Sequence, residues 1–107
     1  MSRRSEQRNK RRQEQFDNDI RWLMGDARGR RIVQSWIDDA GINTVSPFTG
    51  NSATFYKIGQ QDFVRGFVNH CRRVALQDVR RMEDEAAAAT QSAQLEDAQA
   101  VDDPPDA

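Results

Sequence analysis

The 107-residue chain contains one cysteine, one histidine and three prolines, and it has no long apolar run. A lone cysteine excludes an intramolecular disulfide and is typical of a protein from a reducing cytosol. Crossing a bilayer requires about 18 consecutive apolar residues, and the bases near Met1 are not followed by the apolar stretch of a secretory signal. We therefore expect an intracellular protein without membrane insertion.

Residues that usually carry out catalysis or bind metals are scarce. One cysteine and one histidine cannot supply the four ligands of a structural zinc site, and Asp38–Asp39 and Asp102–Asp103 lack the spacing of a calcium loop. The segment FTGN lacks the lysine and the spacing of a phosphate-binding loop. His70 and Cys71 are neighbours, and neighbouring helical residues point about 100° apart, so they do not form a nucleophile–base dyad. We expect no enzymatic activity, no metal and no cofactor.

Acidic and basic residues are segregated along the chain, although the net charge is only −1. Residues 1–12 carry six bases and one acid, a balance of +5, whereas residues 82–107 carry eight acids and no base. Such segregation indicates tails that interact with a partner or with each other.

Apolar residues recur at helical spacing between residues 16 and 82, and no segment alternates with period two long enough to predict a strand. We expect helices at about 16–24, 27–40 and 53–82, with Asp26 as an N-cap and Gly41 as a left-handed helix terminator. The sequence therefore predicts an all-α protein with a small three-helix domain at residues 16–82. A basic arm (1–15) precedes this domain, and an acidic tail (83–107), partly helical or disordered, follows it. A polar helix as short as the arm is marginal in water, so we expect the arm to order only on contact.

The third expected helix carries most of the large apolar residues. Its apolar side is predicted to hold Phe55, Ile58, Phe63, Phe67, Cys71 and Val74, and to be widened by Val64, Val68, Ala75 and Val79. Gly59 and Gly66 lie seven residues apart and therefore share one face. Because each costs about 1 kcal/mol relative to alanine inside a helix, they indicate either tight packing within the domain, which we favour, or close approach by another helix or a ligand.

The basic arm is a candidate nucleic-acid-binding segment. Its bases are Arg3, Arg4, Arg8, Lys10, Arg11 and Arg12. If the arm is helical, four of these arginines share one face, and guanidinium groups suit phosphate. No aromatic residue is interleaved with them, which weakens a base-stacking mode. A solvated charged tail is the simpler alternative.

The segment INTVSPFTGNS at residues 42–52 interrupts the helical pattern with turn-forming residues. We expect Asn51 or Ser52 to cap the following helix, and Phe48 to pack between helices or into a partner. The candidate partner-binding or structural residues are Arg30, Arg31, Phe48, Thr49, Gly50, Asn51 and Ser52, which we expect to form one structured unit.

Three stretches together support a resemblance: DIRWLMGDARGRRIV with Gly29, Arg30 and Arg31; SPFTGNSATF; and YKIGQQDFVRGF with Gly59. Over Asp19 to Glu85, about two-thirds of the chain, this pattern resembles a family of small, poorly characterised proteins of tailed, mainly short-tailed, bacteriophages. Members commonly carry an arginine shortly after that last glycine, where this chain has Gln60 and Gln61. The resemblance implies a phage protein made in the bacterial host cytoplasm, and incorporation in the virion or assembly with it is one expectation that follows.

We therefore predict a non-enzymatic bacteriophage accessory or virion-associated protein that docks on a phage structural or host protein. One alternative is nucleic-acid binding by the basic arm, with the acidic tail competing for the arm. Another is antagonism of a host factor, with the acidic tail mimicking nucleic acid. A homo-oligomer is compatible with the small core, because small helical proteins often gain stability by self-association.

Overall fold

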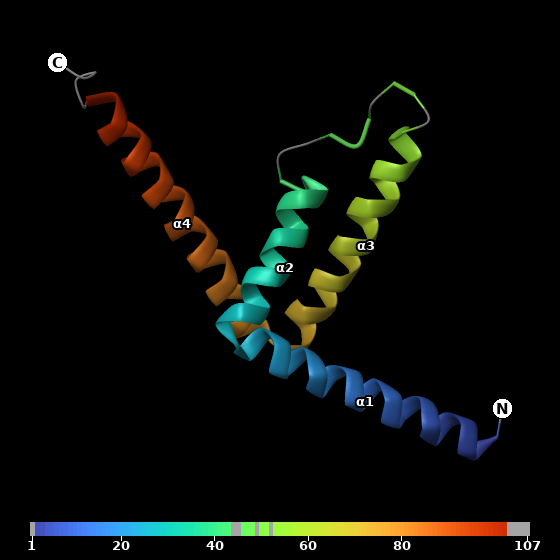
Figure 1. Ribbon diagram of the computed structural model, residues 1–107. Helices are drawn as coiled ribbons and strands as arrows, with labels where there is room; N and C mark the ends of the chain where they lie inside the picture. Colours follow the sequence, from blue (N-terminus) through green and yellow to red (C-terminus); the bar gives the residue numbers. More distant parts are fainter. Residues whose placement is uncertain (1, 44–45, 49, 52, 103–107) are drawn as a thin grey trace.

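The computed structural model describes residues 2–43, 46–48, 50–51 and 53–102. Four helices follow one another in these residues: α1 (Arg3–Gly25), α2 (Ala27–Ala40), α3 (Ala53–Val74) and α4 (Leu76–Asp102) (Figure 1). The described residues contain no strand, so the all-helical prediction is confirmed. Four helices replace the three that the sequence predicted. No helix among the described residues is long and apolar enough to span a membrane.

The expected third helix is divided at Ala75 into α3 and α4, which diverge from this point (Figure 1). The main-chain amide of Ala75 still donates to the carbonyl of Cys71 (2.7 Å), and the amide of Val79 donates to the carbonyl of Ala75 (3.0 Å). The hydrogen bonding therefore continues through a bend. Neither glycine nor proline marks this position, and buried Ala75, Val79 and Met82 continue the apolar spacing of α3. The bend keeps these side chains in the core, and local sequence does not signal it.

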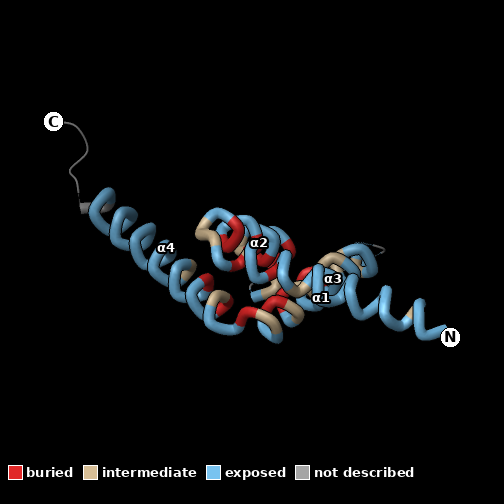
Figure 2. Tube along the Cα trace, turned by 90° about the horizontal axis from the view of Figure 1, so that it is seen from below, coloured by how far each residue is buried: buried red, intermediate tan, exposed pale blue. Residues whose placement is uncertain are grey.

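The core lies where the four helices meet, and the far ends of α1 and α4 are exposed (Figure 2). Its members are Ile20, Met24, Val33, Ile37, Ala40, Val64, Val68, Cys71, Ala75, Val79 and Met82. The contact between α1 and α2 depends on Gly29, because a Cβ there would lie 1.9 Å from the main-chain oxygen of Leu23.

Two predicted helix boundaries in this region are confirmed. Asp26 caps α2 by accepting a hydrogen bond from the main-chain amide of Arg28 (2.8 Å). Gly41 ends α2 in the left-handed conformation, with φ of 67°, which a residue with a Cβ adopts at a cost.

The basic arm, expected to be disordered until contact, is helical and continuous with the rest of α1. Ser2 caps this helix by accepting a hydrogen bond from the amide of Ser5 (3.3 Å). At the other end, α4 continues as a helix to Asp102. Because both helices extend beyond the core, the molecule measures 78 × 38 × 17 Å along its principal axes.

Candidate interaction surface

The aromatic residues of α3 are more exposed than the sequence predicted. Phe55 and Phe63, which were expected on the core side, are 80% and 74% exposed. The core side of α3 is formed by Val64, Val68 and Cys71, which were also expected on the apolar side. Apolar residues occupy more than half of the circumference of α3, but only one sector of a helix can face the neighbouring helices. The aromatic sector is left at the surface.

Tyr56, Gly59, Phe63 and Gly66 follow one another at spacings of three, four and three, and therefore share one side of α3. We call these four residues the aromatic–glycine face. Apart from the adjacent backbone of α3 itself, a Cβ added to either glycine would find no atom of the described residues within 4 Å, whereas Tyr56 and Phe63 are 76% and 74% exposed. Tight packing within the domain, the favoured interpretation of these glycines, is therefore wrong.

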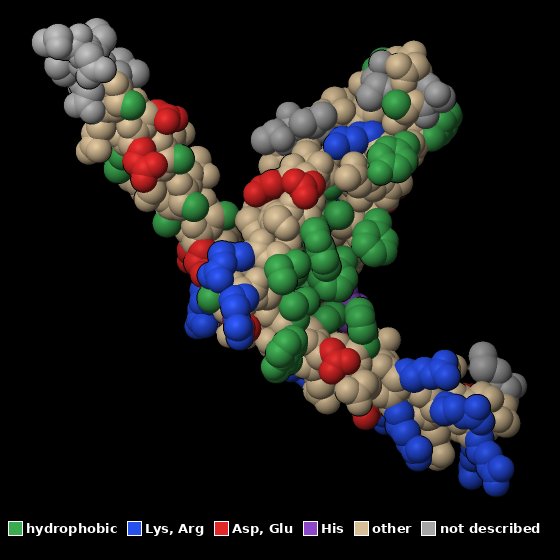
Figure 3. All heavy atoms as spheres, viewed as in Figure 1, with side chains coloured by type: hydrophobic (Ala, Val, Ile, Leu, Met, Phe, Trp, Pro, Cys, Tyr) green, Lys and Arg blue, Asp and Glu red, His purple; other side chains and the backbone are tan. Residues whose placement is uncertain are grey.

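Apolar side chains from α2 and α3 border this face. The rings of Trp36 and Phe67 meet edge to face, with centroids 5.6 Å apart. Trp36, Asp39, Gln60, Phe63 and Val64 line a shallow hollow between the two helices. Figure 3 shows hydrophobic side chains gathered along α3 and where α1, α2 and α3 meet. The surface therefore combines projecting aromatic rings with open notches at the glycines.

His70 lies in an ion cluster that joins α3 to α1. Its Nε2 is 2.9 Å from Oδ1 of Asp17, and Nη2 of Arg73 donates to the same oxygen at 3.3 Å. The hydrogen bond with His70 is the main reason that the pKa of Asp17 is lowered. The ring of Phe16 packs against His70, with centroids 5.0 Å apart. Burial raises the pKa of the Cys71 thiol, which faces the core. His70 and Cys71 therefore lie in different environments, although they are adjacent in the sequence.

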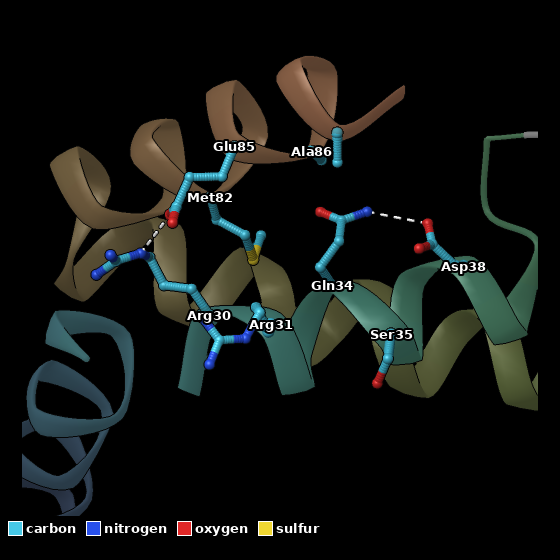
Figure 4. A pocket seen from close by; sticks show the side chains of 9 residues that line it. Arg30, Arg31, Gln34, Ser35, Asp38, Met82, Glu85 and Ala86 are labelled. Atoms are coloured by element: carbon cyan, nitrogen blue, oxygen red, sulfur yellow. Dashed lines mark hydrogen bonds and ion pairs between the residues drawn. The ribbon is translucent and has the colours of Figure 1, made fainter. Parts of the chain in front are cut away.

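Arg30, a candidate binding residue, has a structural role in the fold. Its side chain is 8% exposed, and it donates through Nε to Glu85 of α4 and through Nη1 to the carbonyl of Met24 (3.0 Å). Figure 4 shows Arg30 reaching across to Glu85 beside a groove between α2 and α4, with Met82 at its base. Arg31 lines the same groove and is exposed. Arg81, one helical turn before Glu85, lies 3.8 Å from Asp78, and no ion pair between Arg81 and Glu85 is present among the described residues.

The structure does not bring Arg30 and Arg31 together with the loop after α2. They lie near the start of α2, whereas the loop leaves its opposite end (Figure 1). Phe48 is 75% exposed rather than packed between helices. Gly50 has φ of 80°, and Oδ1 of Asn51 accepts a hydrogen bond from the amide of Ala53 at the start of α3 (2.9 Å). Thr49 and Ser52 lie outside the described residues.

The six arm bases are solvent-exposed on α1 and form no ion pair within the described part of the chain. Arg4, Gln7, Arg8 and Arg11 line a shallow depression on this helix. Three of the four arginines predicted to share a face, Arg4, Arg8 and Arg11, therefore lie on one side of this helix. No hydrogen bond or ion pair links them to the described acids of α4.

Comparison with known proteins adds no family to this description. No family model matches the chain, and no significant match is found among curated proteins or solved structures.

Proposed function

We propose that the protein is a non-enzymatic docking protein, which offers the aromatic–glycine face of α3 to a helix of another protein. The observation that carries this proposal is the pair of open glycines, Gly59 and Gly66, beside the exposed rings of Tyr56 and Phe63. Glycine inside an exposed helix lowers stability by roughly 1 kcal/mol relative to alanine. Because no contact with the described residues of other elements accounts for them, the glycines suit close approach by a partner helix.

The chemistry of the face suits a protein partner. Exposed aromatic residues are enriched at the centres of protein interfaces, because they bury a large area with few rotatable bonds. The rings of Tyr56 and Phe63 would occupy spaces between the side chains of a partner helix. Small residues would let the two main chains approach. Following the resemblance, we place the protein among phage accessory or virion-associated proteins, with a phage structural or host protein as its partner.

Site-specific photo-crosslinking in the natural host tests the docking face. A photoreactive phenylalanine analogue is placed at position 63 or, as a control, at position 22, because Phe63 and Trp22 are 74% and 75% exposed. Position 63 should crosslink to one helical segment of a single protein, and Gly66→Leu should abolish this product by filling the notch. Equal products from both positions, or a product that survives Gly66→Leu, would contradict the proposal.

Mass spectrometry of purified virions then separates the two kinds of partner. A stoichiometric amount of the chain in the particle supports a structural phage partner. Its absence from particles, combined with a crosslinked host protein, supports a host partner.

A further inference from the structure

Two helical segments of opposite charge extend from the core. The basic arm helix comprises residues 3–15 of α1, and the acidic tail helix comprises residues 83–102 of α4. Every arm-helix residue except Ser5 is exposed, as is every residue from 87 to 100. Figure 1 shows the segments pointing away from each other, and Figure 3 shows blue side chains along the arm helix. Neither segment has a partner for its outer part within the described chain.

Because these helical segments are exposed, contacts within a single chain do not account for their stability. Most helices in proteins are stabilised by packing one face, because short isolated helices are marginal in water. The radius of gyration is 19.4 Å, whereas a compact chain of this length would have about 13 Å. The basic arm helix and the acidic tail helix are therefore long segments whose outer parts no other described residues cover.

Charge complementarity identifies a partner for each segment. The basic arm helix, residues 3–15, has a balance of +4, and the acidic tail helix, residues 83–102, has a balance of −6. Asp84, Glu96 and Asp97 are exposed and, within the described residues, form no ion pair. The arm bases are equally unpaired. Each segment thus carries the charge that the other one lacks.

The two segments cannot meet within one chain in this fold. Burial of Ile20 and Met24 fixes the direction of α1, and burial of Met82 together with the Arg30–Glu85 ion pair fixes the direction of α4. We propose that the basic arm helix of one copy lies along the acidic tail helix of a second copy. At 1.5 Å per residue, residues 3–15 span about 20 Å and residues 83–102 about 30 Å, so the acidic tail helix is long enough to cover the whole basic arm helix.

Reciprocal pairing strengthens this contact. A single exposed ion pair contributes little, but a two-fold dimer contains two arm–tail contacts, and the second forms at a high effective concentration once the first exists. Alanines at positions 86–89 and 93 give the tail helix small side chains. A nucleic-acid partner is less well supported, because it would cover the arm bases but leave the acidic tail helix without a partner, and no aromatic residue accompanies the arm bases.

Analytical ultracentrifugation of the nuclease-treated full-length chain tests the proposal. The wild-type chain should self-associate at about 0.1 M NaCl and dissociate at about 1 M, where the Debye length falls from about 10 to about 3 Å. The arm variant is Arg4→Glu, Arg8→Glu and Arg11→Glu, and the tail variant is Asp84→Lys, Glu96→Lys and Asp97→Lys. A control with the charge change of the arm variant is Arg31→Glu, Arg65→Glu and Arg80→Glu, at exposed bases outside both segments.

The arm and tail variants should each lose at least about tenfold in self-association constant, whereas the control should retain most of the wild-type affinity. A mixture of the arm and tail variants should form a heterodimer, because one copy keeps the acidic tail and the other keeps the basic arm. A monomeric wild-type chain at low salt, equal losses in the arm variant and the control, or no association in the mixture would overturn the proposal.

Binding of a DNA duplex by a chain that stays monomeric would replace self-association with nucleic-acid recognition as the role of the basic arm helix. These variants leave the aromatic–glycine face unchanged, so crosslinking at position 63 reports separately on the proposed docking function.

Discussion

Arg30 of α2 and Glu85 of α4, 55 residues apart in the chain, form an ion pair that joins these two helices. The Arg30 side chain is nearly buried, while the Glu85 side chain is 43% exposed. The second hydrogen bond of Arg30, to the carbonyl of Met24, extends the contact to the end of α1. One guanidinium therefore connects three helices beside the point where α4 leaves the core.

We expect Glu85→Gln to lower the free energy of unfolding by about 1–2 kcal/mol, because it leaves a nearly buried guanidinium without its countercharge. The partial exposure of Glu85 keeps this value below that of a fully buried pair. Asp84→Asn is the matched control, since Asp84 is exposed and pairs with no described residue; it should change stability by less than about 0.5 kcal/mol. Urea unfolding measures both variants, and equal effects would show that the pair is not stabilising.

Gly29→Ala and Gly66→Ala should have opposite effects on stability. At Gly29 the added methyl group would meet the Leu23 main chain, so we expect a loss of about 1–3 kcal/mol. At Gly66 the space is open and the residue is helical, so alanine should stabilise the isolated chain by about 0.5–1 kcal/mol. Thermal unfolding followed by circular dichroism measures both changes. Destabilisation by Gly66→Ala would indicate an intramolecular contact at this glycine.

Stability should fall in acid partly because of Asp26. Hydrogen bonds from the side chain and the main-chain amide of Arg28 lower the pKa of Asp26 to about 2, from about 3.9 in an unfolded chain. A lowered folded-state pKa stabilises the fold above about pH 4, and this contribution is lost as the pH falls towards 2. Asp26→Asn keeps an acceptor for the cap but removes the titration. The decrease in urea midpoint between pH 5 and about pH 2.5 should therefore be smaller in this variant than in the wild type. An equal decrease in urea midpoint in both proteins would show that titration of Asp26 does not contribute to the loss of stability in acid.

Cys71 should be nearly inert in the folded chain. It is fully buried, and burial raises the pKa of its thiol, which reduces the reactive thiolate. We expect modification by a disulfide reagent near pH 8 to be at least about 100-fold slower in buffer than in urea, because reaction requires opening of the core. The double variant Cys71→Ala and Ala93→Cys, with the thiol on the exposed part of α4, should react rapidly in both conditions. Rapid reaction of the folded wild type would contradict the buried position.

Sequence reasoning located features that depend on neighbouring residues. Asp26 and Gly41 act at the two ends of α2 as predicted, because capping involves hydrogen bonds and main-chain angles within a few residues. The all-helical character followed from apolar spacing for the same reason. Of the candidate surface, the sequence revealed the unusual glycines at positions 59 and 66, but the favoured explanation for them was wrong.

Features that depend on contacts between distant segments were not predictable in this way. The apolar pattern continues through Ala75 without interruption, so only packing on the other helices reveals the bend between α3 and α4. Phe63 was placed in the core for the same reason. The sequence shows that α3 has a wide apolar surface, but it does not show which part of that surface the other helices cover. The pairing of Glu85 with Arg30 rather than with Arg81 likewise depends on the position of α2.

By itself, the sequence determined the all-helical class, the caps of α2 and the separation of opposite charges, because spacing, capping and composition are local properties. Tertiary structure decided which side of α3 is buried and where the two charged helices point. A helix can bury only the sector that faces other helices, and their positions are set by contacts between residues far apart in the chain.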